Sequence, residues 1–160
     1  MAITMKIDGM EELGKELAKL GEKAQDIASG ALFDGAGIMA NALNNGVNSI
    51  ETAPFRYAPP GQTRLPSPQE KAAISRKIGI AKFKKEMDSV DTIVGMGKGS
   101  GYAQVAGKKK AVLLIARSIN SGTSFMKKQP FFRKAVSSGS GKASAAIVQK
   151  IEEAIKENTK

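Results

Sequence analysis

The distribution of proline constrains the fold of this chain more than any other feature. Five of the six prolines lie in one stretch, residues 54–68. Because proline fixes φ and has no N–H to donate, this stretch suits neither the interior of a helix nor a central strand. We therefore predict an extended loop over residues 53–67. Its aromatic and arginine side chains favour a contact surface, and a disordered insertion is the alternative.

Two helices are predicted before this loop. Over residues 10–28, apolar side chains recur every three or four residues, at Met10, Leu13, Leu17, Leu20, Ala24 and Ile27. This spacing lines one face of an amphipathic helix. A second helix is expected over residues 31–45, although each glycine within it costs about 1 kcal/mol relative to alanine.

After the loop, Ser67-Pro68-Gln69-Glu70 has the form of a capping box, which predicts a short helix over 68–77 closed by Gly79. Strands are predicted over 80–84 and 90–96, joined by a turn at 86–89. In the second strand, alternation would put four side chains on one face: Val90, Thr92, Val94 and Met96.

The last part of the chain returns to helix. Residues 110–117 are the most apolar run and predict a central strand, although periodicity over so short a run does not exclude a helix. Pro130 is expected to begin a helix, with a break at 137–141 and a further helix over 143–156. The whole pattern predicts one α+β domain over residues 1–160: a small antiparallel sheet packed against N-terminal and C-terminal helices, with a long proline-rich loop.

The composition excludes several kinds of chemistry. The chain has no histidine and no cysteine, which rules out Ser-His-Asp, Cys-His and zinc-hydrolase mechanisms. The glycine-rich segments 95–101 and 139–142 match neither the dinucleotide fingerprint nor the P-loop. We therefore expect no catalytic, cofactor-binding or metal-binding residues, and a protein that is not an enzyme.

The formal net charge of +10 favours contact with nucleic acid or with an acidic protein surface, and a solvated basic surface is the plainer explanation. Because rigid scaffolds usually carry function on loops, residues 53–67 and the glycine-rich loop 95–107 are the predicted contact elements. The candidate interface residues are Phe55, Arg56, Tyr57, Arg64, Lys98, Lys108, Lys109, Lys110 and Arg133. We find no membrane-length apolar run and no secretory signal, so synthesis in the cytoplasm is expected.

The segment from Ile119 to Ala135 resembles a signature of the tail-component family of long-tailed bacteriophages, which includes minor tail protein Z-like and tail-completion proteins. In that family a strand ends in a Gly-Thr turn, and a short basic loop leads into a helix that opens with Pro-Phe, an arginine and an alanine. The matching residues here are Gly122, Thr123, Pro130, Phe131, Arg133 and Ala135. The phenylalanines and proline are also explained by a purely structural junction that docks the C-terminal helix.

The resemblance implies a structural virion component, made in the cytoplasm of the bacterial host, that joins or completes the tail at the head–tail interface. Its expected partners are further copies of itself in a ring, expected to be a hexamer, the head-connector and tail-tube proteins, and passing DNA through non-specific contacts. Tail-completion, tail-terminating and neck roles all fit. The alternative is a stand-alone basic nucleic-acid-binding module. One observation counts against it: the aromatic residues do not interleave with the basic clusters along the sequence.

Overall fold

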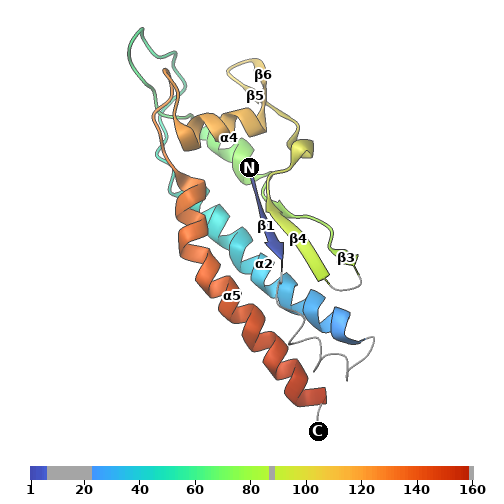
Figure 1. Ribbon diagram of the computed structural model, residues 1–160. Coiled ribbons are helices and arrows are strands. Elements are labelled where there is room, and N and C mark those ends of the chain that lie inside the picture. Colours follow the sequence, from blue (N-terminus) through green and yellow to red (C-terminus); the bar gives the residue numbers. More distant parts are fainter. Residues whose placement is uncertain (7–22, 87–88, 159–160) are drawn as a thin grey trace.

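The computed structural model describes residues 1–6, 23–86 and 89–158 (Figure 1). Its elements follow the chain in this order: β1 (Ala2–Lys6), α2 (Lys23–Asn48), α3 (Pro68–Ser75), β2 (Gly79–Ile80), β3 (Lys84–Glu86), β4 (Ser89–Gly95), the 3-10 turn η2 (Lys98–Ser100), β5 (Tyr102–Val105), β6 (Lys108–Ala111), α4 (Val112–Ser121) and α5 (Phe131–Asn158). The predicted α+β class, with small antiparallel sheets and helices near both ends of the chain, is confirmed.

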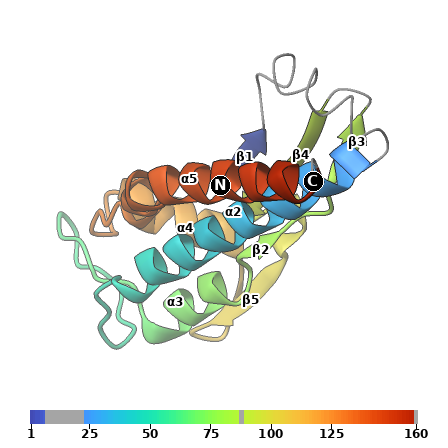
Figure 2. The same cartoon turned by 90° about the horizontal axis from the view of Figure 1, so that it is seen from below.

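The longest elements, α2 and α5, lie side by side and antiparallel (Figures 1 and 2). Their approach depends on glycines that face the partner helix. A Cβ added to Gly35 would lie 2.6 Å from the side chain of Ile147, and one added to Gly139 would lie 2.8 Å from the Cβ of Ala42. The predicted break at 137–141 is therefore wrong: Gly139 lets the helices pack closely, and this packing outweighs a helix-propensity cost of about 1 kcal/mol.

The predicted gap between two N-terminal helices is also wrong, because α2 is continuous through residues 29–30. Ala28, Ala31 and Leu32 are all buried on either side of the gap, so tertiary packing holds the helix through Gly30. The part of the first predicted helix that covers residues 10–22 lies outside the described residues.

A four-stranded antiparallel sheet is built around β4. β1 pairs with one edge of β4, and β2 and β3 pair with successive parts of the other edge. The predicted alternation in β4 is confirmed, since Val90, Thr92 and Val94 are buried whereas Ile93 is exposed. The predicted strand 80–84 is instead split into β2 and β3. Glu86 pairs with Ser89, and residues 87–88 of the predicted turn lie outside the described residues.

The predicted central strand over 110–117 is wrong beyond its first two residues. β6 ends at Ala111 and the helix α4 begins at Val112. The buried side chains Val112, Ile115, Ala116 and Ile119 follow spacings of three, four and seven residues, while Leu114 is exposed. This is the helical period, and the eight-residue run used for the prediction was too short to reveal it.

The glycine-rich loop predicted at 95–107 contains more structure than expected. It includes η2 and all of β5, and β5 pairs with β6 in a two-stranded hairpin. The hairpin turns at Ala106 and Gly107, both with positive φ (51° and 74°), as two-residue hairpin turns require. The extended loop predicted at 53–67 is confirmed, since its one ladder contact is an isolated bridge from Arg64 to Met126.

Candidate functional site

Two regions can be distinguished along the α2–α5 pair. We call residues 49–77 and 97–130 the basic lobe; it contains α3, η2, β5, β6, α4 and the connecting loops. The helical body is the rest of the described chain: α2, α5 and the four-stranded sheet. Figure 1 shows the basic lobe at one end of the helix pair. A buried cluster that includes Ile74, Val105 and Ile119 lies mainly in the lobe and extends to Val47 of α2 and Phe131 of α5.

The basic lobe carries the whole net charge of the chain. It holds 12 of the 25 lysines and arginines but only two of the 15 acidic residues, Glu51 and Glu70. Its charge is therefore +10, and the remaining sequence sums to zero. Glu70 is buried and bound by Arg64, whereas Glu51 is exposed and lies 3.4 Å from the exposed Lys127. The charge that the lobe presents outward is therefore mostly positive.

A buried ion pair holds the long loop against α3. Ser67 caps α3: its hydroxyl accepts the N–H of Glu70 at 3.2 Å, and its own N–H donates to Glu70 Oε2 at 2.8 Å. This confirms the predicted capping box. Arg64 then donates Nη1 and Nη2 to the two carboxylate oxygens of Glu70, each at 2.7 Å. One glutamate thus completes the cap and fixes the loop.

The environment of Glu70 keeps it ionised. Burial by itself would raise the pKa of Glu70, but the hydrogen bonds from Arg64 and Ser67, together with the charges of Arg64 and Lys110, lower it below its ordinary value of 4.5. Lys110 Nζ lies 3.5 Å from Oε1. Among the described residues, no buried side-chain nitrogen or oxygen lacks a hydrogen-bond partner. The polar network inside the lobe is therefore complete.

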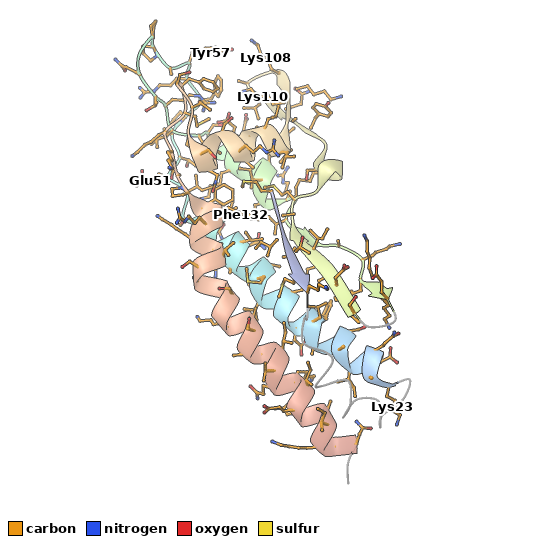
Figure 3. All side chains as sticks on the ribbon, viewed as in Figure 1. Lys23, Glu51, Tyr57, Lys108, Lys110 and Phe132 are labelled. Atoms are coloured by element: carbon orange, nitrogen blue, oxygen red, sulfur yellow. The ribbon has the colours of Figure 1, made fainter. Side chains whose placement is uncertain are left out.

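Cation–aromatic contacts join the long loop to the β5–β6 hairpin. Two cations contact the Phe55 ring: Arg64 lies 4.8 Å and Lys110 Nζ 5.1 Å from its centroid. Tyr57 packs edge-on against Phe55 with centroids 5.3 Å apart, and Lys108 lies 5.8 Å from the Tyr57 centroid. Figure 3 shows Tyr57, Lys108 and Lys110 together at the tip of the lobe. The predicted contact loop 53–67 therefore meets β6, whose Lys108 and Lys110 were predicted as interface residues and follow directly after the other predicted contact loop, 95–107.

These contacts correct one sequence-based argument. Aromatic and basic residues do not interleave along the chain, but in space they alternate, since Lys109 lies over the Tyr102 ring at 4.9 Å in addition to the Phe55 and Tyr57 contacts. Folding brings the two kinds of side chain together from separate segments. Each contact contributes about 0.5–1 kcal/mol at an exposed position.

A pocket of ≈ 600 Å³, which we call the lobe pocket, opens beside this cluster. Its apolar walls come from α4, β5 and the loop after α4, namely Tyr102, Leu114, Ile115, Phe125 and Met126. Arg64, Glu70, Lys109 and Lys110 supply its charged groups. The volume is in the usual range for ligand pockets. Sequence reasoning missed Glu70, Tyr102, Leu114 and Phe125 as site residues. Only Glu70 had a signal, the capping box.

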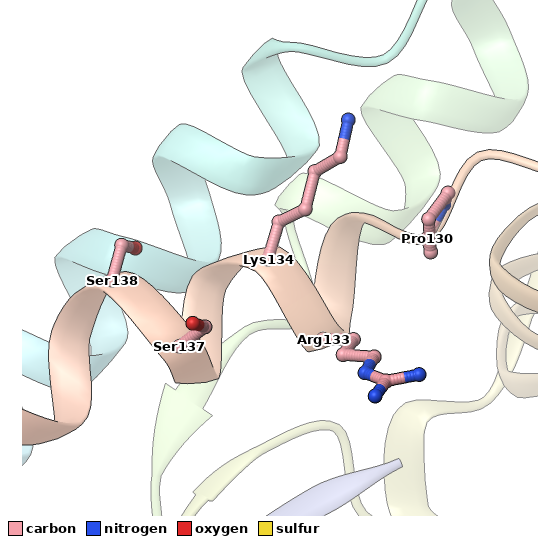
Figure 4. Close-up of a pocket in the computed structure, with 5 residues that line it drawn as sticks. All are labelled: Pro130, Arg133, Lys134, Ser137 and Ser138. Carbon is pink, nitrogen blue, oxygen red and sulfur yellow. The ribbon is translucent and has the colours of Figure 1, made fainter.

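The remaining predicted interface residues lie elsewhere. Arg56 is exposed in the long loop, and Lys98 begins η2. Arg133 lies on α5, beside a shallow pocket of ≈ 380 Å³ that it lines with Pro130, Lys134, Ser137 and Ser138. Figure 4 shows the Arg133 and Lys134 side chains pointing in different directions. Their charges do not converge on one ligand, and Arg133 is not part of the lobe cluster.

The segment that resembles the tail-component signature forms the junction between α4 and α5. Gly122, with φ of 75°, ends a helix and not the expected strand. The Thr123 hydroxyl accepts the Met126 N–H at 3.0 Å, and Phe131 and Ala135 are each 2% exposed. The junction loop pairs with the long loop, since Arg64 N–H donates to Phe125 at 2.9 Å. These residues thus have structural roles in docking α5.

Comparison with known proteins identifies no relative: no protein-family model, no curated protein and no solved structure matches the chain. Within residues 1–6, 23–86 and 89–158, no group of three acidic, histidine or cysteine side chains is arranged to hold a metal ion. No helix in the same residues combines the length and apolarity needed to cross a membrane.

Proposed function

We propose that this chain is a structural subunit of a long-tailed bacteriophage that joins or completes the tail at the head–tail interface, as one member of a ring. Two findings support the proposal. The first is the similarity of residues 119–135 to the tail-component signature. The second, which carries most weight, is the basic lobe: separate loops meet there in one cationic surface with an apolar pocket, at the end of a stiff helix pair.

The composition of the lobe surface supports assembly. Four of the seven exposed large apolar side chains among the described residues belong to it: Tyr57, Tyr102, Leu114 and Phe125. Aromatic side chains and arginine are enriched at protein interfaces, and contiguous exposed apolar surface marks contact sites. The lobe combines these features with a charge that would exclude other basic surfaces and attract acidic ones.

The proposed mechanism is geometric. Each subunit would present one surface to its neighbour in the ring and others to the head connector and the tail tube. A contact between two different surfaces closes into a ring when the rotation between neighbours divides a full turn. A basic surface facing the lumen would also let DNA pass with sequence-independent phosphate contacts. The subunit would be made in the host cytoplasm and retained in the virion.

Light scattering across a concentration series, at low and at physiological salt, tests this proposal. We expect growth to one closed mass, six times the 16.8 kDa of the chain for a hexamer. A double variant in the lobe, Lys108→Glu with Lys109→Glu, should weaken this assembly. The matched control is Lys142→Glu with Lys156→Glu, which makes the same charge change on exposed positions of α5. Unlimited growth, or a monomer at every concentration, contradicts the ring.

A stand-alone nucleic-acid-binding module is the second candidate, and the spatial alternation of lysine and aromatic rings in the lobe favours it. Fluorescence anisotropy with single-stranded and double-stranded oligonucleotides distinguishes the two. A monomer that binds DNA with a steep salt dependence supports the module and contradicts the ring. Weak binding that is lost at physiological salt leaves the assembly proposal as the better account.

A further inference from the structure

The lobe pocket exposes apolar surface that the fold itself does not use. Three of its side chains are large, apolar and open to solvent: Tyr102 is 63% exposed, Leu114 61% and Phe125 49%. Behind them, Ile115 and Met126 are buried and close the wall. Single exposed apolar residues are ordinary, but three around one concave surface favour a binding site.

The charge around the pocket is net positive. Glu70, the only carboxylate among the described residues that line it, is 1% exposed and bound in two places by Arg64, so it offers little charge to a ligand. Lys109 and Lys110 lie at the pocket, over the Tyr102 and Phe55 rings, and Lys110 also lies 3.5 Å from Glu70. A ligand with carboxylates next to an apolar group would match both features, because surface lysines gain from an anionic partner.

The shape and lining favour a protein segment over a nucleic acid. The rings of Tyr102 and Phe125 could stack on a base, but the rest of the apolar wall, Leu114, Ile115 and Met126, is aliphatic or thioether and offers no donor to one. The guanidinium of Arg64, the group best suited to a phosphate, is already occupied by Glu70. A phosphate backbone would therefore be limited to the protruding lysines. A large apolar side chain would occupy part of the pocket, against the buried wall of Ile115 and Met126.

We propose that the lobe pocket receives an aromatic or leucine side chain from an acidic segment of a partner protein, with carboxylates of that segment contacting Lys109 and Lys110. This inference rests on the proposed assembly function and names the chemistry of the partner surface. The apolar side chain provides the anchor in the pocket. The carboxylates at its rim provide orientation and rate of association more than affinity.

The probe is a short fluorescent peptide of glutamate and alanine with one central phenylalanine, and its matched control has alanine in place of the phenylalanine. Both are titrated against the full chain by fluorescence anisotropy. Burial of one phenylalanine should tighten binding about tenfold or more. Equal affinity of the two peptides means that only charge is recognised, and it overturns the proposal.

Two pairs of variants locate the binding. Leu114→Glu and Lys109→Glu change the pocket, whereas Val148→Glu and Lys142→Glu make the same changes at exposed positions of α5, where Val148 is 55% exposed. We expect the pocket variants to weaken the phenylalanine peptide about tenfold or more and the α5 variants to leave it unchanged. Thermal unfolding of all four confirms that folding is intact. If the pocket variants and the α5 variants lose affinity for the peptide equally, the peptide does not bind in the lobe pocket, and the proposal is overturned.

Competition separates the other occupants. If an oligonucleotide displaces the peptide and Leu114→Glu abolishes oligonucleotide binding, the occupant is nucleic acid and the proposal fails. If Leu114→Glu abolishes assembly of the chain with itself, the occupant is a second copy, and the proposal fails again. A wild-type chain that binds the phenylalanine peptide but forms no ring retains the pocket inference and loses the proposed function. A chain that forms a ring but does not bind the phenylalanine peptide retains the proposed function and loses the pocket inference.

Discussion

The basic lobe and the helical body are stabilised in different ways. The body depends on distributed packing between α2, α5 and β4, where small residues let long elements approach closely. The lobe is built of short helices, a hairpin and loops. It is held by a buried apolar cluster that it shares with Val47 of α2 and Phe131 of α5, by one buried ion pair and by cation–aromatic contacts, and its net charge equals that of the whole chain.

This difference indicates which surface is available for binding. In the body, most apolar side chains pack in the helix–helix and helix–sheet contacts, and Phe33, Ile93 and Val148 are exposed singly. In the lobe, one polar network fixes the loops from inside, and the exposed apolar side chains around the lobe pocket, such as Leu114 and Phe125, lie outside the buried core. Substitutions at a few polar positions should therefore destabilise the lobe most, whereas substitutions at close backbone contacts should destabilise the body most.

The largest effect is expected from Glu70→Gln in the lobe. The amide cannot satisfy the Arg64 guanidinium, which is 5% exposed and would be left as an unpaired buried charge. Removal of one partner from such a pair costs about 3–5 kcal/mol. Urea unfolding measures the change. The double variant Arg64→Met with Glu70→Met should lose much less stability than either single change, because no unpaired charge remains.

Acid unfolding provides an independent check on the same residue. The pKa of Glu70 in the folded chain is below its ordinary value of 4.5, so the unfolded chain binds the proton more readily. The stability due to Glu70 is then fully present above pH 4.5 and is lost as the pH falls through the lowered folded-state pKa. The wild-type chain should lose more stability over this range than Glu70→Gln. Parallel acid profiles would contradict the role given to Glu70.

The body should be most sensitive at Gly46. A Cβ there would lie 2.8 Å from the main-chain carbonyl oxygen of Phe131, which cannot move without shifting the start of α5. We expect Gly46→Ala to destabilise the chain by about 1–3 kcal/mol, measured by urea unfolding. Gly35→Ala is the matched control, because its new Cβ would first meet the flexible Ile147 side chain, at 2.6 Å, and would lie 3.3 Å from the Ala143 carbonyl oxygen. A larger loss at Gly35 would show that side-chain packing, not backbone approach, sets the helix spacing.

The sequence predicted the features that depend on near neighbours in the chain, and it missed features that depend on tertiary packing. Local chemistry was sufficient for the Ser67–Glu70 cap, the long loop and the alternation in β4, because each depends on neighbours within a few residues. The breaks predicted at Gly30 and Gly139 failed because helix propensity is weaker than the packing of α2 on α5. The strand predicted at 110–117 failed because its helical period extends to Ile119.

The candidate site was predictable only in part. Phe55, Tyr57, Arg64 and the lysines at 108–110 were identified from composition and loop position, and the structure brings them together. Arg133 was included by its place in the family-like motif and lies apart, on α5. Leu114 and Phe125 gave no signal, since an exposed apolar residue can be recognised only after α4 and the following loop have their places.

The smallest effect compares two glycines that both have open space around a new Cβ. Gly37 lies within α2, where alanine is the better helix former, so Gly37→Ala should stabilise the body by about 0.4–1 kcal/mol. Gly61 lies in the lobe loop with φ of 75°, a conformation that costs an alanine about 1 kcal/mol. Thermal unfolding should give shifts of opposite sign. If Gly61→Ala also stabilises the chain, the lobe loop does not depend on that turn, and its conformation is set by the Arg64–Glu70 contact alone.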